Sequence, residues 1–143
     1  MITVKCRATL PFPLDDIWNV LTDFRQDLWR SDVARVENLE PGRSFLTYTK
    51  SGLATRFCVT ECIPQWLYVL RMENKAMRGR QTWTLSQAKA GVRVALREEA
   101  IPNHPATAAA AALFLRRRQQ RCLHDLRRTL DHKKEDVQWT GRT

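Results

Sequence analysis

The chain has 143 residues, 43% hydrophobic and 27% charged, which fits one globular domain and excludes collagenous, low-complexity and wholly disordered chains. No apolar run approaches the ~18 residues of a membrane span, and the opening residues alternate polar with apolar, unlike a signal peptide, so we expect a cytoplasmic protein. The net charge is +9, and four scattered cysteines are too few for a disulfide scaffold.

Residues 2–10 alternate strictly between apolar and polar side chains, which predicts a half-buried strand. Residues 13–24 then predict a helix, because Pro13 suits a helix start and Asp15 and Asp16 would face the positive end of the helix dipole. Its apolar stripe consists of Leu14, Ile17, Trp18 and Leu21. A second short helix or turn is expected to follow, carrying Phe24, Leu28 and Trp29.

Residues 34–100 read as short strands separated by turn signals such as Pro41-Gly42 and Ser51-Gly52. Consecutive strands joined by short loops form antiparallel hairpins, so with residues 2–10 they predict a seven-stranded antiparallel sheet. The six expected strands are 34–39, 44–50, 53–63, 66–74, 80–87 and 92–100.

Turn lengths predict which residues face each other. A two-residue turn at Ser51-Gly52 places Tyr48 opposite Thr55 and Leu46 opposite Phe57. Pro64 forbids a tight primed turn, and a four-residue connection there places Val59 opposite Leu70 and Glu61 opposite Tyr68. The same arithmetic gives the pairs Phe57–Met72, Arg56–Glu73, Trp83–Val94 and Leu85–Val92. One face of the sheet is thereby expected to hold Leu46, Tyr48, Phe57, Val59, Ile63, Leu70 and Met72.

A long helix is predicted from Pro105 to about residue 134, because Asn103 or His104 can cap it and residues 106–112 are mostly alanine. Thirty residues span about 45 Å, so its end is expected to project past the sheet. Its apolar side would consist of Ala108, Ala112, Leu115, Gln119, Cys122, Leu123, Leu126 and Leu130. The expected domain covers residues 1–134, followed by a loose tail over 135–143.

The same segment concentrates positive charge, with eight Lys/Arg against two Asp from Pro105 to Lys134. Such a stripe suits an acidic protein, nucleic acid or an anionic membrane surface, and is equally typical of a solvated helix face. Its candidate partner-binding residues are Phe114, Arg117, Arg121 and Arg128.

Small alanines facing large side chains of a curved sheet leave space between the layers, which predicts a ligand cavity unless Trp, Phe and Leu side chains fill it. Its candidate ligand-binding residues are Tyr48, Phe57, Val59, Glu61, Tyr68, Leu70, Gln81, Trp83, Ala108 and Ala112. Glu61 and Tyr68 are also the candidate catalytic pair, since a desolvated carboxyl group can act as general acid or base. The alternative is that Glu61 lies in water at the rim of the sheet.

The sequence does not supply the residues that a catalytic triad, a metal site or a phosphate-binding loop would need. All three histidines lie at or within the final helix, and the sequence pairs none of them with a serine or cysteine nucleophile. Cys58 and Cys62 would lie about 13 Å apart, too far to share a zinc ion, and five glycines leave no phosphate-binding loop. We expect no metal and no cofactor.

The order of elements resembles the START-like, or polyketide-cyclase/SRPBCC, superfamily over about residues 2–134. The resemblance rests on Pro13, the Ile17-Trp18 pair, Asp23, and Val59-Thr60-Glu61 followed by Pro64. It implies an α+β helix-grip fold, in which a curved seven-stranded antiparallel sheet wraps a long C-terminal helix, with one or two short helices after the first strand. It also implies binding of a lipid, polyketide or isoprenoid-like molecule between sheet and helix, or a polyketide cyclase/dehydratase activity. The arginine-rich helix keeps a third hypothesis open, an interaction protein.

Overall fold

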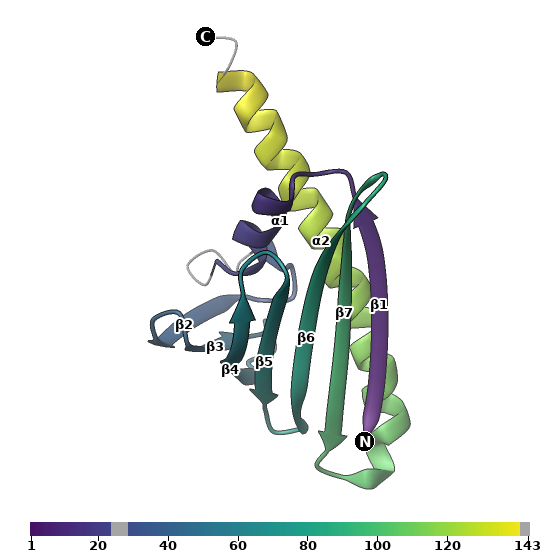
Figure 1. The fold of residues 1–143 in the computed structure, drawn as a ribbon. Coiled ribbons are helices and arrows are strands. Elements are labelled where there is room, and N and C mark those ends of the chain that lie inside the picture. Colours follow the sequence, from purple (N-terminus) through teal and green to yellow (C-terminus); the bar gives the residue numbers. More distant parts are fainter. Residues whose placement is uncertain (24–28, 141–143) are drawn as a thin grey trace.

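The computed structural model describes residues 1–23 and 29–140 (Figure 1). All seven predicted strands and both main helices are present. In chain order they are β1 (Ile2–Leu10), α1 (Leu14–Leu21), β2 (Arg35–Glu40), β3 (Ser44–Tyr48), β4 (Ala54–Ile63), β5 (Leu67–Glu73), β6 (Met77–Ala88), β7 (Gly91–Pro102), a 3₁₀ turn (Pro105–Thr107) and α2 (Ala108–Thr140). Phe24 and Leu28 lie outside the described residues, and Trp29 is buried.

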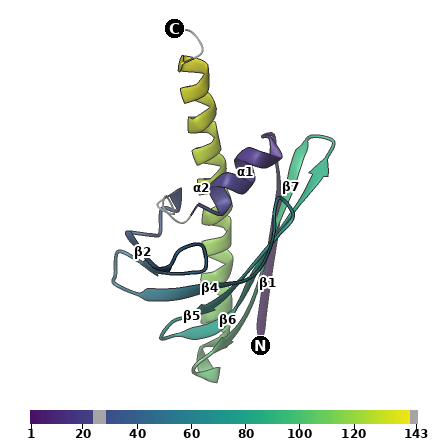
Figure 2. The same cartoon turned by 60° about the vertical axis from the view of Figure 1, so that its left-hand side comes forward.

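The strands form one antiparallel sheet in the order β1-β7-β6-β5-β4-β3-β2. Five hairpins run in sequence from β2 to β7, and β1 completes the sheet by pairing with β7 along its whole length. The sheet curves, and both helices lie on its inner side (Figure 2). This is the helix-grip architecture, and it confirms the predicted fold class.

The predicted apolar stripes meet inside the curve. Ile17, Trp18 and Leu21 of α1 are buried, as are Leu115, Cys122, Leu126 and Leu130 of α2. The inward positions of the strands supply the rest of this core, from β1 and β7 (Val4, Leu10, Val92, Val94 and Leu96) and also from β3 to β6 (Phe45, Phe57, Leu70, Met72, Trp83 and Leu85). Alternation along β1 and β7 and a 3.6-residue period along α2 therefore place these apolar side chains correctly.

The predicted pairing of β3 with β4 is wrong by one residue. Phe45, not Leu46, lies opposite Phe57, and Tyr48 lies opposite Ala54. The connection is longer than the expected turn: Thr49 donates its N–H to Leu53 O at 3.0 Å, and Gly52 takes a positive φ of 89° between them. Three-residue hairpin loops use such a left-handed residue, and the extra residue turns Leu46 and Tyr48 to the outer face.

A β-bulge changes the second predicted register. Val59–Leu70, Phe57–Met72 and Arg56–Glu73 pair as expected, but the pairing shifts between Val59 and Glu61. Glu61 then lies opposite Val69 instead of Tyr68, because the bulge adds one unpaired residue to β4. Beyond it, Glu61 and Ile63 are exposed, so the expectation that they share the inner face is wrong.

Trp83 and Leu85 keep their predicted face, although their partners are Leu96 and Val94. The pairing of β6 with β7 differs from the predicted register by two residues, because the strands are joined by the tight turn at Lys89-Ala90. A two-residue shift leaves every side chain on the face predicted for it.

α2 has 33 residues, which corresponds to about 50 Å, and its C-terminal turns project past the sheet as expected (Figure 1). The helix continues to Thr140, so residues 135–140 are helical instead of irregular, and residues 141–143 lie outside the described part. The domain boundary at residue 134 stays a prediction. Neither described helix combines the length and apolar character that crossing a bilayer requires.

Candidate functional site

Side chains nearly fill the space between sheet and α2. The enclosed cavity has a volume of about 20 Å³, room for about one water molecule. Five of the candidate ligand-binding residues line it, namely Phe57, Tyr68, Leu70, Gln81 and Trp83, together with Leu21, Trp29, Arg30 and Phe45. The cavity lies among β3 to β6, Leu21 of α1 and the segment after α1, so it is not the space that the small alanines of α2 were expected to leave.

The other candidate ligand-binding residues lie elsewhere. Val59, Ala108 and Ala112 are half-buried, and none of them lines the cavity. Tyr48 is on the outer face, where its hydroxyl donates to Glu37 at 3.1 Å and Arg35 stacks over its ring. Glu61 is exposed and not opposite the buried Tyr68, so the candidate catalytic pair is not assembled.

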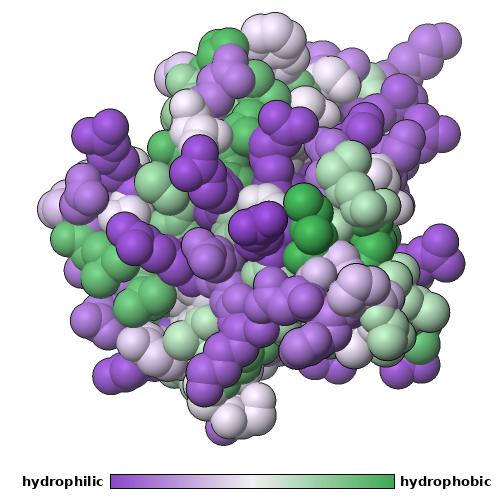
Figure 3. All heavy atoms as spheres, turned by 90° about the horizontal axis from the view of Figure 1, so that it is seen from below, coloured by the Kyte–Doolittle hydropathy of each residue, from purple (hydrophilic) through white to green (hydrophobic). Residues whose placement is uncertain are grey.

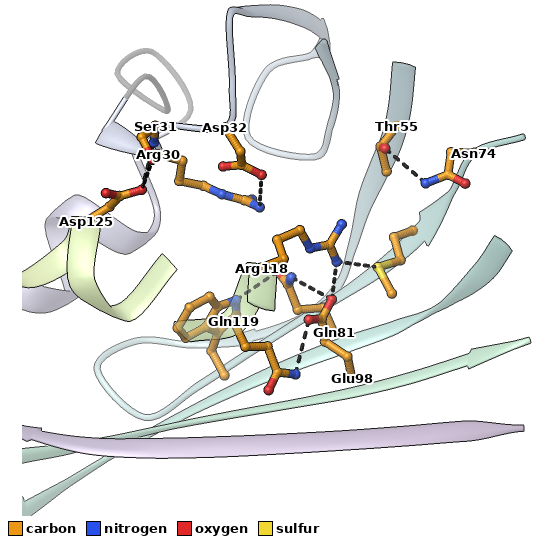
Figure 4. Close-up of polar contacts among 12 residues, drawn as sticks. Arg30, Ser31, Asp32, Thr55, Asn74, Gln81, Glu98, Arg118, Gln119 and Asp125 are labelled. Carbon is orange, nitrogen blue, oxygen red and sulfur yellow. Dashed lines mark hydrogen bonds and ion pairs between the residues drawn. The ribbon is translucent and has the colours of Figure 1, made fainter. Parts of the chain in front are cut away.

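A buried polar cluster lies where α2 crosses β6 and β7 (Figure 4). Glu98 of β7 is fully buried, and its carboxylate pairs with Arg118 of α2. Gln119 and Gln81 donate to the same carboxylate at 3.1 and 3.3 Å. Gln81 in turn accepts a hydrogen bond from Trp83 Nε1 at 2.8 Å. The carboxylate of Glu98 therefore organises donors from two elements, α2 and β6.

Gln119 also connects α2 to the first strand, because its Nε2 donates to the Val4 carbonyl at 3.0 Å. Arg118 places its guanidinium against Met72 of β5, with 3.7 Å between Nη2 and Sδ. The cluster thus connects α2 to β1, β5, β6 and β7.

A second buried carboxylate ties the segment after α1 to α2. Asp125 accepts hydrogen bonds from the Ser31 N–H at 2.8 Å and the Ser31 hydroxyl at 2.7 Å (Figure 4). Arg128 reaches its other oxygen at 3.3 Å. Beside it, Arg30 pairs with Asp32 at 3.5 Å, with the Arg30 side chain 8% exposed.

Cys122 lies between these two sets of charges. Burial raises the pKa of its thiol to about 12, and the fields of Arg30, Asp32, Glu98 and Arg118 all act on it. The thiol is neutral at physiological pH, so Cys122 is a packing residue rather than a nucleophile.

An open cleft of about 470 Å³ lies between α2, the β3–β4 connection and the segment after α1. Four basic side chains line it, Lys50, Arg117, Arg118 and Arg121, against one acidic side chain, Asp32. Phe114 supplies an exposed aromatic ring, with the guanidinium of Arg118 5.7 Å from its centroid. Arg118 therefore belongs both to the cleft wall and to the buried cluster.

Trp29 lines the enclosed cavity, and its buried Nε1 has no hydrogen-bond partner among the described residues. Ser44 Oγ and Gln119 Oε1 are likewise buried without a partner there, outside the cavity lining. Leaving such a group unpaired costs about 1–3 kcal/mol, so Trp29 offers a donor to a small polar group in the cavity.

Glu98, Arg118 and Asp125 are site residues that were not among the predicted ones. Alternation of β7 contains the signal for Glu98, because it follows Val92, Val94 and Leu96 at two-residue steps on the inward face. Asp125 lies beside Cys122 and Leu126 on the apolar side of α2. A carboxylate at a core position requires a buried partner, which points to an arginine.

The four candidate partner-binding residues lie on the accessible side of α2. Phe114, Arg117 and Arg121 border the cleft, and Arg128 is half-exposed while it pairs with Asp125. Among the described residues, no group of three or more His, Cys, Asp or Glu side chains is placed to hold a metal ion.

Comparison with known proteins gives one family and a consistent fold. The sequence model of the polyketide cyclase/dehydrase and lipid transport family matches residues 1–131. No curated protein matches the chain significantly.

The solved structures share the fold at low identity. A Zhui aromatase/cyclase from Streptomyces sp. R1128 superposes with a TM-score of 0.82 at 13% identity, covering 92% of this chain and 94% of that one. A START superfamily protein from Mycobacterium smegmatis gives 0.78 at 7% identity, covering 91% and 97%. A conserved protein from Geobacillus kaustophilus gives 0.78 at 10% identity, covering 92% and 96%.

Proposed function

Since the chain belongs to the polyketide cyclase/dehydrase and lipid transport family, we propose that it binds a hydrophobic small molecule between sheet and α2, entering through the cleft. One observation carries the proposal: Arg118 forms part of the cleft wall and also pairs with the buried Glu98. A molecule in the cleft therefore lies directly against the residue that closes the interior. The cleft volume lies in the range typical of small-molecule sites.

The charge of the cleft indicates the ligand's polar end. Lys50, Arg117 and Arg121 make no hydrogen bond or ion pair with the described residues, so their charges are available to an acidic group. A carboxylate or phosphate there would gain charge-assisted hydrogen bonds. We therefore propose an amphiphile with an anionic head group.

The apolar part of the ligand needs room that the enclosed cavity of about 20 Å³ does not provide. Arg118 and the Arg30–Asp32 pair lie between cleft and interior, so binding separates them or leaves the apolar part at the mouth beside Phe114. The unpaired Trp29 Nε1 would then report entry, because its environment changes on opening.

The test compares three twelve-carbon amphiphiles: dodecanoate, dodecanol and dodecyltrimethylammonium. Native mass spectrometry and tryptophan fluorescence would measure binding below the micellar concentration of each. We expect dodecanoate to bind roughly tenfold more tightly than dodecanol and the cation to bind least, since one charge-assisted contact is worth about that factor.

Variants locate the site. Arg117→Glu with Arg121→Glu should abolish the preference for dodecanoate, whereas Arg116→Glu with Arg127→Glu, which makes the same charge change on α2 outside the cleft, should retain it. Absence of saturable binding by all three amphiphiles, or equal loss in both variants, would count against the proposal.

A further inference from the structure

The outer face of the sheet is strongly basic. Outward positions on β1, β5, β6 and β7 carry seven basic residues, Lys5, Arg7, Arg71, Arg78, Arg80, Arg93 and Arg97, against two acidic ones, Glu73 and Glu99. All seven basic residues are exposed, and both helices lie on the opposite side of the sheet (Figure 2). Seen from below, at the end where the chain starts and α2 begins, hydrophilic and hydrophobic side chains are interspersed (Figure 3).

The pairing register sets like charges side by side on this face. Lys5 lies directly opposite Arg97, and Arg71 lies directly opposite Arg80. Like charges at directly opposed positions destabilise a sheet, and Glu99 offsets part of this cost because it pairs with Arg80 and Arg97, one member of each opposed pair.

The protein's own carboxylates neutralise only part of the charge. Glu99 is shared by Arg80 at 3.0 Å and Arg97 at 3.4 Å. Lys5, Arg7, Arg71, Arg78 and Arg93 form no hydrogen bond or ion pair with the described residues. Five cationic side chains on one face thus remain available to an external anion.

Small outward side chains hollow the surface between the cations. One hollow of about 450 Å³ is lined by Lys5, Arg7 and Arg97 around Thr82, Thr84 and Ala95. A second, of about 420 Å³, is lined by Arg71, Arg80 and Glu99 around Thr60, Gly79 and Ile101. The two hollows follow each other along β6, where residues 79–80 border one and residues 82–84 the other.

We propose that this outer face binds the phosphate backbone of a nucleic acid. Arginine, lysine and threonine are the side chains that contact phosphate and sugar. Outward positions on the four described strands hold no aromatic residue, whereas protein interfaces and membrane surfaces are typically anchored by aromatic side chains. Without aromatic residues for base stacking, binding is independent of sequence and depends steeply on salt.

The experiment measures fluorescence anisotropy with two labelled RNA duplexes of unrelated sequence, each of about two helical turns, over a series of salt concentrations. The full chain should bind both with similar affinity. Lys5→Gln with Arg7→Gln and Arg71→Gln should weaken binding at least roughly tenfold. It should also reduce the slope of log K against log salt by about one for each phosphate that the variant no longer neutralises.

The matched control removes three charges from the exposed side of α2 outside the cleft, as Arg116→Gln with Arg127→Gln and Lys133→Gln, and should leave duplex binding nearly unchanged. The proposal is overturned if neither duplex binds at low salt, if the α2 variant is weakened as much as the sheet variant, or if polyglutamate or anionic vesicles bind where duplexes do not. Dodecanoate binding is measured on the same sheet variant, where we expect it unchanged, so the cleft and the outer face can fail separately.

Discussion

Glu98 shows most clearly how a single residue determines this interior. It is fully buried, and Arg118, Gln81 and Gln119 all point their donors at its carboxylate (Figure 4). Taking two charges out of water is costly, and their attraction offsets that cost only when further hydrogen bonds satisfy the remaining atoms. Glu98 meets this condition. The Arg80–Glu99 pair does not need further hydrogen bonds, because the Arg80 side chain is 60% exposed and stays in contact with water.

Glu98→Leu should therefore destabilise the protein by about 3–5 kcal/mol, because it leaves Arg118 buried without its carboxylate. Urea unfolding followed by tryptophan fluorescence measures the loss. The double variant Glu98→Leu with Arg118→Met should recover part of it, since two apolar side chains replace the pair.

Arg80→Met is the control, because it breaks an ion pair whose arginine is 60% exposed, and it should cost less than about 1 kcal/mol. Equal effects of Glu98→Leu and Arg80→Met would show that the buried pair contributes no more than the exposed one.

At the scale of the elements, Gly79 of β6 lies directly against the backbone of β7. A Cβ at this position would lie 2.0 Å from the Glu99 carbonyl oxygen, so only a residue without a side chain allows the two strands to approach as they do. The same glycine borders a hollow of the outer face, and a larger residue would disturb both the pairing and that surface.

Gly79→Ala should cost about 2–3 kcal/mol, because the strands must separate to admit the methyl group. Thermal unfolding gives the stability change, and hydrogen exchange of the β6–β7 amides locates it.

Gly42→Ala is the matched comparison. Nothing lies within 4 Å of a Cβ there, and the cost comes only from its φ of 71°, about 1 kcal/mol. If Gly79→Ala and Gly42→Ala lower the stability equally, the close approach of β6 and β7 at Gly79 adds nothing to the cost of the substitution.

Element order, the inward faces of β1, β6 and β7 and the apolar stripe of α2 could be predicted, because each depends on a local period that solvent exposure enforces. Pairing registers could not be predicted, because a single extra residue in a turn or a bulge changes which residues lie opposite each other. The unpaired residue of the β4 bulge and the third residue in the Lys50–Gly52 loop have no counterpart in the alternation pattern, and they moved Glu61 and Tyr48 away from the expected site. Candidate residues on strands without such shifts, such as Gln81 and Trp83, lie inside as expected.

At the scale of the whole molecule, α2 connects the parts of the fold. It contacts β1, β7 and α1, and through Asp125 it holds the segment after α1. Its last described buried side chain is Leu130, and the family match ends at residue 131. How far the interior would be filled could not be predicted, because it depends on how α1 and Trp29 pack beneath α2 rather than on the alanines of α2.

A chain ending at Lys134 should keep its fold and lose less than about 1 kcal/mol, since it retains every buried side chain described in α2. Circular dichroism during heating measures this and tests the domain boundary.

A chain ending at His124 lacks Asp125, Leu126 and Leu130 and should not fold, because each buried leucine alone contributes about 2–5 kcal/mol. If the chain ending at Lys134 melts many degrees below the full chain, the domain boundary lies beyond residue 134.

The pairing of β1 with β7, and of Gln119 with the Val4 carbonyl, also determines when the protein can fold during synthesis. Translation produces β1 first, yet its hydrogen-bonding neighbour and its helical cover are made roughly a hundred residues later. Contacts so distant in sequence slow folding and leave a nascent apolar strand with an unprotected edge. β1 therefore has neither its neighbouring strand nor its helical cover until β7 and the first half of α2 have been synthesised.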